Sequence, residues 1–283
     1  MAKNRTNQDQ NLKTAIQDVI KGMMDRVLEK VLIEDPFIPD EHRANKPLYS
    51  ALVPDEIFKG SHFERRFVTP FGTAWEKLAL AAARIGLGFG ELGRSVTGRV
   101  NRERLRRIQQ VLNELEHAQV GERRRRPEWK SELSFVLEGQ SRQSVPVTVI
   151  CDVYAESTKN GKRYAFELKA PLPNSDQTKV SKEKLLKLYA MESPQVDEAY
   201  YALPYNPYGL KSKYAWTHPA RWFNMKEDPV VLIGDEFWEK IGGLGTYQAF
   251  ITAVNEIAPQ YKDRIYREYL GISPPPSSLS TKL

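Results

Sequence analysis

Hydrophobic residues recur at helical spacing near the N-terminus and alternate with polar ones in the middle of the chain. The N-terminal pattern predicts an amphipathic helix whose apolar residues lie three and four positions apart: Ile16, Ile20, Met23, Val27 and Val31. A residue before proline resists the helical conformation, so this helix should end before Asp35-Pro36. Its apolar side packs either on the protein's own core or on a second copy.

Two further helices are predicted before the middle of the chain. One opens at Phe71-Gly72-Thr73, and the other is a basic helix from Arg102 to Glu116. Between them, residues 88–93 match the pattern G-x-G-x-x-G. The dinucleotide-binding fingerprint needs a strand before these glycines and a helix after them. Here a predicted helix precedes them, so we expect a glycine-rich turn and no bound dinucleotide.

The alternating stretches 147–154 and 163–170 predict two strands, and Asn160-Gly161 between them is typical of a tight hairpin turn. Further strands are expected at 198–203 and 229–234, with helices at 182–191, 235–241 and 247–256. This order predicts an α/β fold in which a central mixed sheet is flanked by helices on both faces and preceded by a helical extension.

Three chemically suited side chains lie on the predicted hairpin. Asp152 is on its first strand, and Glu167 and Lys169 are on its second strand. Residues two apart in a strand point to the same face, so Glu167 and Lys169 should converge with Asp152. Two carboxylates suit a hard divalent cation, and an ammonium suits a neighbouring phosphate, so this arrangement indicates phosphodiester hydrolysis.

The Asp152 and Glu167-Leu168-Lys169 pattern resembles the PD-(D/E)xK nuclease superfamily, although Cys151 stands where the superfamily motif has proline. Three longer stretches resemble TdeIII-like type II restriction endonucleases, and the likeness extends over about residues 45–255. They are Phe63 to Gly72, Phe166 to Asn174 and Ala202 to Gly209.

This resemblance implies a restriction-endonuclease-like fold and Mg²⁺-dependent cleavage of double-stranded DNA at a short palindrome of the GGNCC kind. Asp152, Glu167 and Leu168 form the implied metal site, with Mn²⁺ able to substitute, and Lys169 orients or deprotonates the attacking water. Glu76 either reaches toward the metal or is an exposed helical residue. A homodimer would cut both strands, and a cognate DNA methyltransferase would be its genetic partner.

The overall composition agrees with a DNA-binding protein. The 283 residues carry a net charge of +6, which modestly favours a polyanionic partner. One cysteine, no run of eighteen apolar residues and a polar N-terminus predict a cytoplasmic protein without a membrane span. We expect one endonuclease domain over residues 1–272, with a helical extension over about 1–60, a core over about 61–255, and a disordered tail at 273–283.

Candidate DNA contacts fall into three groups. The run Arg123 to Arg126 is either a clamp on phosphates or a solvated loop. The polar segment after the second catalytic strand, where Ser181 is the expected helix cap, offers side chains that could read bases: Asn174, Asp176, Gln177, Lys179 and Lys182. The third group is Lys211, Lys213 and Arg221.

Two other functions are compatible with these residues. One is a repair or recombination nuclease that recognises DNA structure instead of sequence. The other is a DNA-binding protein that has lost catalysis, although the complete set of Asp152, Glu167 and Lys169 argues against it.

Overall fold

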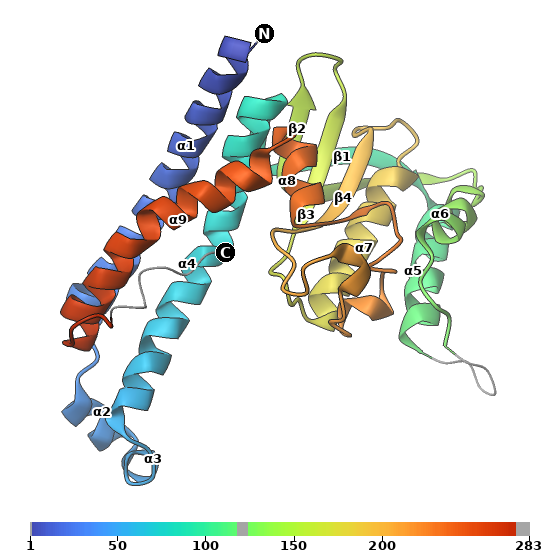
Figure 1. Ribbon diagram of the computed structural model, residues 1–283. Coiled ribbons are helices and arrows are strands. Elements are labelled where there is room, and N and C mark those ends of the chain that lie inside the picture. Colours follow the sequence, from blue (N-terminus) through green and yellow to red (C-terminus); the bar gives the residue numbers. More distant parts are fainter. Residues whose placement is uncertain (1, 118–123, 276–283) are drawn as a thin grey trace. The chain divides into compact units, whose positions relative to one another are not determined.

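The computed structural model describes residues 2–117 and 124–275 of the chain (Figure 1). It divides into two compact units, of which the first comprises Met1–Leu78 and Gln248–Leu283 and the second comprises Ala79–Tyr247. Within the described ranges, no helix has both the length and the apolar character needed to cross a membrane.

The first unit is helical. Its elements are α1 (Ala2–Glu29), the π-helix η1 (Lys30–Glu34), α2 (Pro39–Asn45), α3 (Pro47–Ser50), the beginning of α4 (Asp55–Gly86), most of α9 (Thr246–Arg264) and the π-helix η4 (Ile265–Leu270). The predicted apolar residues of α1 and η1 are all buried. The side chains of Lys13 and Gln17 on α1 bond Glu256 on α9. The apolar side of α1 therefore packs within the chain itself. This favours packing on the protein's own core over a contact with a second copy.

Helix α4 begins earlier than the sequence suggested. It starts at Asp55, not near Phe71, and continues through Pro70. An internal proline removes one helical hydrogen bond. Phe63, Phe67 and Phe71 lie four residues apart, and their neighbouring ring centroids are 6.1 and 5.1 Å apart. This ladder of aromatic contacts at i, i+4 spacing stabilises the helix on both sides of the proline.

The second unit contains a mixed sheet with the strand order β1-β2-β3-β4-β5. The strands are β1 (Gly88–Asn101), β2 (Ser144–Ser157), β3 (Arg163–Leu168), β4 (Glu198–Leu203) and β5 (Val231–Ile233). The pairs β1–β2 and β2–β3 are antiparallel, whereas β3–β4 and β4–β5 are parallel. The predicted mixed sheet flanked by helices is confirmed.

The predicted glycine-rich turn at residues 88–93 is wrong, because these residues form the first half of β1. Gly88 to Leu92 pair with β2 from Ser157 to Val153. A side chain at Gly90 would place its Cβ 3.0 Å from the Cβ of Ala83. The glycine therefore lets the strand lie close to α4, a packing role that does not resemble a phosphate-binding loop.

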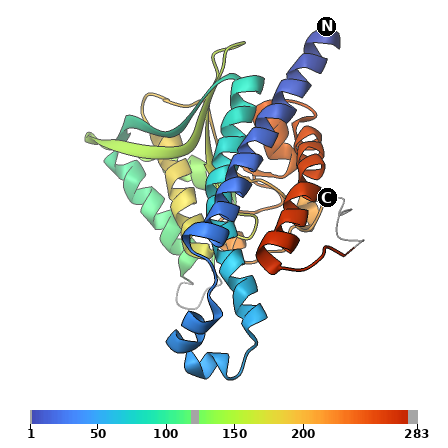
Figure 2. The same ribbon diagram turned by 90° about the vertical axis from the view of Figure 1, so that its left-hand side faces the viewer.

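Helices cover both faces of the sheet. One face carries α5 (Arg102–Glu116), α6 (Trp129–Leu137) and α7 (Ser175–Ala190), and both views show α5 and α7 running side by side (Figures 1 and 2). Phe166 on β3 contacts Phe237 of α8 (Asp235–Gly242), whereas its neighbour Glu167 bonds Ser181 of α7. Adjacent strand residues point to opposite faces, so α7 and α8 lie on opposite sides of the sheet.

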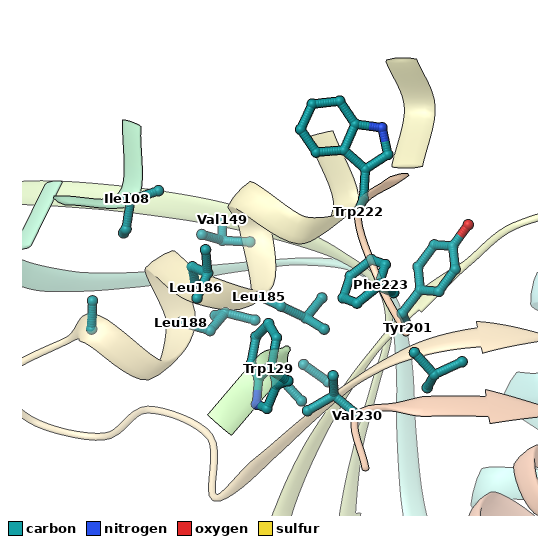
Figure 3. Packing of buried hydrophobic residues seen from close by; sticks show 14 of the residues in the cluster. Ile108, Trp129, Val149, Leu185, Leu186, Leu188, Tyr201, Trp222, Phe223 and Val230 are labelled. Atoms are coloured by element: carbon teal, nitrogen blue, oxygen red, sulfur yellow. The ribbon is translucent and has the colours of Figure 1, made fainter. Parts of the chain in front are cut away.

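A large apolar core lies between the sheet and the α5–α7 layer (Figure 3). Leu185 and Leu186 of α7 and Tyr201 of β4 belong to it. The ring of Tyr201 stacks on Phe223 at a centroid distance of 4.8 Å, and Phe223 follows the short 3-10 helix η3 (Pro219–Arg221). This packing fixes α7 against β3 and β4.

One ion pair is fully buried beside this core. The side chains of Lys182 on α7 and Glu132 on α6 are both 0% exposed, and their Nζ and Oε2 atoms are 2.5 Å apart. Lys182 also donates to the backbone carbonyl of Trp222. Burial lowers the pKa of Lys182 and raises the pKa of Glu132, against the attraction within the pair. The pair therefore links α6 and α7 to Trp222, the residue that directly follows η3.

We predict that Lys182→Ala lowers the free energy of unfolding by about 3–5 kcal/mol, because it leaves Glu132 buried without its counter-charge. The double substitution Lys182→Met with Glu132→Leu should lie closer to the wild type, since it removes both charges and keeps the volume. Urea denaturation followed by tryptophan fluorescence measures both values. If the double variant is as unstable as Lys182→Ala, the loss of stability comes from removing the ion pair and not from leaving Glu132 unpaired.

Candidate active site and DNA-binding surface

The predicted hairpin is confirmed, and it brings the two acidic residues together. At its turn, Gly161 adopts a φ of 68°, and its N–H donates to the carbonyl of Ser157 at 2.7 Å. Val153 on β2 pairs with Phe166 on β3. The next position along this register sets Asp152 beside Glu167, at the end of the hairpin remote from its turn.

Asp152 is held by backbone and side-chain donors of the opposite strand. Its Oδ2 accepts from the N–H of Leu168 at 2.8 Å and lies 3.2 Å from Nζ of Lys169. The side chain is 18% exposed. Solvent and substrate can therefore approach a carboxylate whose orientation is already fixed.

Glu167 is more deeply placed, since only 4% of its side chain is exposed. Its Oε1 lies 2.8 Å from Nζ of Lys169 and accepts from the hydroxyl of Ser181 at 3.3 Å. Its Oε2 accepts from Nζ of Lys184 at 2.7 Å. Each oxygen of this buried carboxylate thus has a cationic neighbour, which offsets the cost of burying the charge.

Lys169 bridges the two acids. Its Nζ also donates to the carbonyl of Leu168 at 2.8 Å. Burial lowers the pKa of its ammonium, but the charges of Glu167 and Asp152 outweigh that effect and hold the pKa above its ordinary value. The structure therefore brings together Asp152, Glu167 and Lys169 as the sequence predicted.

Sequence reasoning missed Lys184, the second ammonium at this site. It lies on α7, one helical turn after Ser181, so that both residues face β3. A helical Lys in a Lys-rich segment gives no sign of its destination from sequence alone. Its spacing from Ser181 becomes informative once Glu167 is known to face α7.

The donor set fits a hard cation. Asp152 and Glu167 offer carboxylate oxygens, and Leu168 offers a backbone carbonyl, while none of the three supplies nitrogen or sulfur. Mg²⁺ prefers such oxygen ligands and usually keeps several waters, so two carboxylates can suffice. No cluster of three or more His, Cys, Asp or Glu side chains suited to a metal occurs among residues 2–117 and 124–275. The residues present thus fit a hard divalent cation.

Cys151 and Glu76 have different surroundings. Cys151 is buried, and burial raises the pKa of its thiol to about 12, so it packs as an apolar residue where the superfamily motif has proline.

Glu76 is a half-buried residue of α4 in the first unit, whereas the hairpin belongs to the second unit. A role for Glu76 at the metal stays a prediction.

Helix α7 begins at Ser175, seven residues before the predicted start at Lys182. Asn174 caps it, because its side-chain oxygen accepts from the N–H of Gln177 at 2.8 Å. The expected cap at Ser181 is therefore wrong. Asp176 and Gln177 are exposed in the first turn, which leaves them available to a ligand.

The predicted lysine contacts differ in their surroundings. Lys182 is fully buried, which is incompatible with a base contact. Lys179 pairs with Glu116 and lies over the ring of Trp222, 5.6 Å from its centroid. Lys211 bonds the carbonyl of Val231 and pairs with Glu236 at 2.8 Å. Lys213 is exposed in the 3-10 helix η2 (Lys211–Lys213).

The arginine run borders a basic cavity of about 530 Å³. Arg123 lies outside the described residues. Arg125 pairs with Glu114 at 2.7 Å, whereas Arg124 and Arg126 are exposed. The cavity is lined by three members of the run and by residues of α7 and the η3 segment: Arg124, Arg125, Arg126, Pro127, Ser175, Thr217, His218, Ala220 and Arg221. A concave surface with four arginines at the start of a helix suits phosphate oxygens.

These features define a class of protein: an α/β protein of restriction-endonuclease-like fold, with two carboxylates and lysines at the edge of a central hairpin. A family model described as "Type II restriction endonuclease, HinfI" matches residues 12–258. The chain therefore belongs to the HinfI family of type II restriction endonucleases, which confirms the predicted class of enzyme. The narrower TdeIII-like assignment stays a prediction.

Three curated relatives agree, and all are described as type II restriction enzymes from Herpetosiphon aurantiacus. HgiEI is 24% identical over 258 residues, which cover 87% of this chain and 90% of the relative. HgiCII is 25% identical over 243 residues, with 80% and 82% covered. HgiBI is 24% identical over 222 residues, with 75% and 77% covered.

A prediction separates the two roles of Asn174. If capping is its function, Asn174→Ala should lower the free energy of unfolding by about 1 kcal/mol, and Asn174→Asp should restore it, since aspartate caps equally well. Chemical denaturation measures both values. A stable Asn174→Asp variant with reduced cleavage would instead show a role of this side chain at the DNA, since aspartate lacks the amide N–H donors and its negative charge repels phosphates.

Proposed function

We propose that the chain cleaves double-stranded DNA in a Mg²⁺-dependent reaction at a short palindromic site of the GGNCC kind. The observation that carries this proposal is the convergence of Asp152, Glu167 and Lys169, where Nζ of Lys169 lies 3.2 and 2.8 Å from the two carboxylates. Membership of the HinfI family agrees with this chemistry.

Asp152, Glu167 and the carbonyl of Leu168 would hold the cation, with Mn²⁺ able to substitute. When bound, the cation would supply positive charge at the phosphate and lower the pKa of a water molecule. Against the effect of burial, the two carboxylates raise the pKa of Lys169 and keep it an ammonium, so it would orient that water and offset negative charge on the attacked phosphate without taking up the proton. The fixed orientation of Asp152, set by the Leu168 N–H, reduces the rearrangement needed before reaction.

DNA would lie across the basic cavity and the first turn of α7. Arg124, Arg126 and Arg221 would grip phosphates, which adds affinity without sequence information. The exposed side chains of Asp176 and Gln177, together with the amide of Asn174, would read base edges near the cut. The lysines at 179, 211 and 213 rank below these residues as contacts, because Lys179 and Lys211 already have acidic partners.

Cleavage of both strands of a palindrome is simplest with two identical active sites, so we propose a two-fold homodimer. A cognate DNA methyltransferase would protect the host sites without needing to contact this protein. Both would act in the cytoplasm, where foreign DNA enters.

The test of this function is digestion of plasmid DNA by the purified protein with Mg²⁺, followed by sequencing of the ends. Discrete fragments with one shared end sequence are expected. A smear, or a preference for branched substrates, would point to a structure-specific nuclease instead.

Asp152→Asn should abolish cleavage and retain specific binding, because Asp152 serves the metal and not DNA affinity. Binding is measured by gel shift with Ca²⁺, and cleavage is measured with Mg²⁺. Normal cleavage by Asp152→Asn would refute the active-site assignment.

Replacing Arg124 and Arg126 with Ala should weaken binding to all DNA sequences alike. The slope of log affinity against log salt should fall by about two, because each phosphate that an arginine neutralises contributes roughly 0.9 to it. The matched control is Lys159→Ala with Arg142→Ala, which removes two exposed charges away from the cavity. An equal slope in the arginine variant and the wild type would identify the run as a solvated loop.

A further inference from the structure

The ammonium of Lys184 lies between the two catalytic carboxylates although it belongs to neither catalytic strand. Its Nζ is 2.7 Å from Oε2 of Glu167 and 3.9 Å from Oδ1 of Asp152. It reaches them from α7, and its side chain is 27% exposed. One ammonium thus bonds Glu167 and lies within ion-pair distance of Asp152, each through a single oxygen.

The remaining oxygens of the acids have other partners. Oδ2 of Asp152 accepts from Leu168 N–H and Lys169, and Oε1 of Glu167 faces Lys169 and Ser181. Lys184 thus faces Asp152 Oδ1 and Glu167 Oε2, the two carboxylate oxygens that Lys169 does not contact.

We propose that Lys184 is a placeholder for the divalent cation: it holds the two carboxylates together until the metal displaces it. The proposal rests on the metal-dependent function proposed above. Two neighbouring carboxylates repel each other, and Glu167 is almost excluded from water. The ammonium of Lys169 offsets only one of the two negative charges, so balancing the pair takes a second positive charge.

The surroundings of Lys184 suit a cation that can leave. Lys184 lines a cavity of about 10 Å³ together with Cys151, Leu185 and Leu188 among other residues, a space at the lower limit for one water molecule. Its side chain is partly exposed and has four rotatable carbons, so the ammonium can move toward solvent when another cation takes its place.

In this role Lys184 competes with the metal, so its removal should strengthen metal binding. Replacing Lys184 with Met should tighten binding of Mn²⁺ alone, in the absence of DNA, by roughly two- to fivefold, the factor expected for removal of a partly exposed ion pair. Lys187→Met is the matched control, because Lys187 lies on the same helix and pairs with Glu183 at 2.7 Å. Titration calorimetry and Mn²⁺ electron paramagnetic resonance measure the dissociation constants of the full-length variants.

A second measurement uses the wild-type chain and does not depend on the folding of a variant. Lysine acylation followed by mass spectrometry should label Lys184 faster with Ca²⁺ than with a chelator, whereas labelling of Lys187 should stay unchanged. Equal Mn²⁺ affinity in Lys184→Met and the wild type, or equal labelling of Lys184 with and without Ca²⁺, would overturn the placeholder role.

The outcomes also separate this inference from the proposed function. If Mn²⁺ binds the wild type and Asp152→Asn equally, or binds neither, the metal site itself is wrong. If Mn²⁺ binding requires Asp152 but ignores Lys184, the metal site stands and only the placeholder role fails.

Discussion

The register of the β2–β3 hairpin is the constraint on which the rest of the site depends. Pairing of Val153 with Phe166 places Asp152 beside Glu167 on the face covered by α7. A slip of one residue would send the glutamate to the opposite face, toward α8. The register is fixed at the turn by Gly161 and on the two faces by the apolar packing of Phe166 and Ala165. Catalytic geometry and core packing are thus specified by the same alignment.

The site shows how a buried carboxylate can be kept in a protein core. Glu167 is surrounded by the hydroxyl of Ser181 and by two ammonium groups, one from Lys169 just after β3 and one from α7. A hydrophobic environment alone would favour the neutral acid. The two ammonium groups offset the negative charge of this buried carboxylate. The same device recurs in a purely structural setting at Lys182 and Glu132.

Local signals were enough to predict much of this arrangement. The bounds of α5 and β4 agree with the sequence, because amphipathic spacing in α5 and a run of β-forming residues in β4 are unambiguous. The convergence of the two acids and Lys169 also followed from strand alternation. The extent of α4 and the strand at residues 88–93 did not, since Pro70 and the glycines usually end regular structure and tertiary packing overrides them here. Lys182 and Lys184 look alike in sequence. Only the elements packed against α7 show that Lys182 is a buried structural residue and that Lys184 lies at the candidate site.

Helix α7 joins regions with different tasks. Its first turn presents Asp176 and Gln177 to solvent, its middle contacts the carboxylates through Ser181 and Lys184, and Lys182 anchors it to α6. A helix is nearly rigid over such a length, so a displacement of its first turn would also move the residues that contact the carboxylates. If the first turn reads DNA as proposed above, attempts to redesign sequence preference there would alter turnover as well, and both properties would have to be selected together.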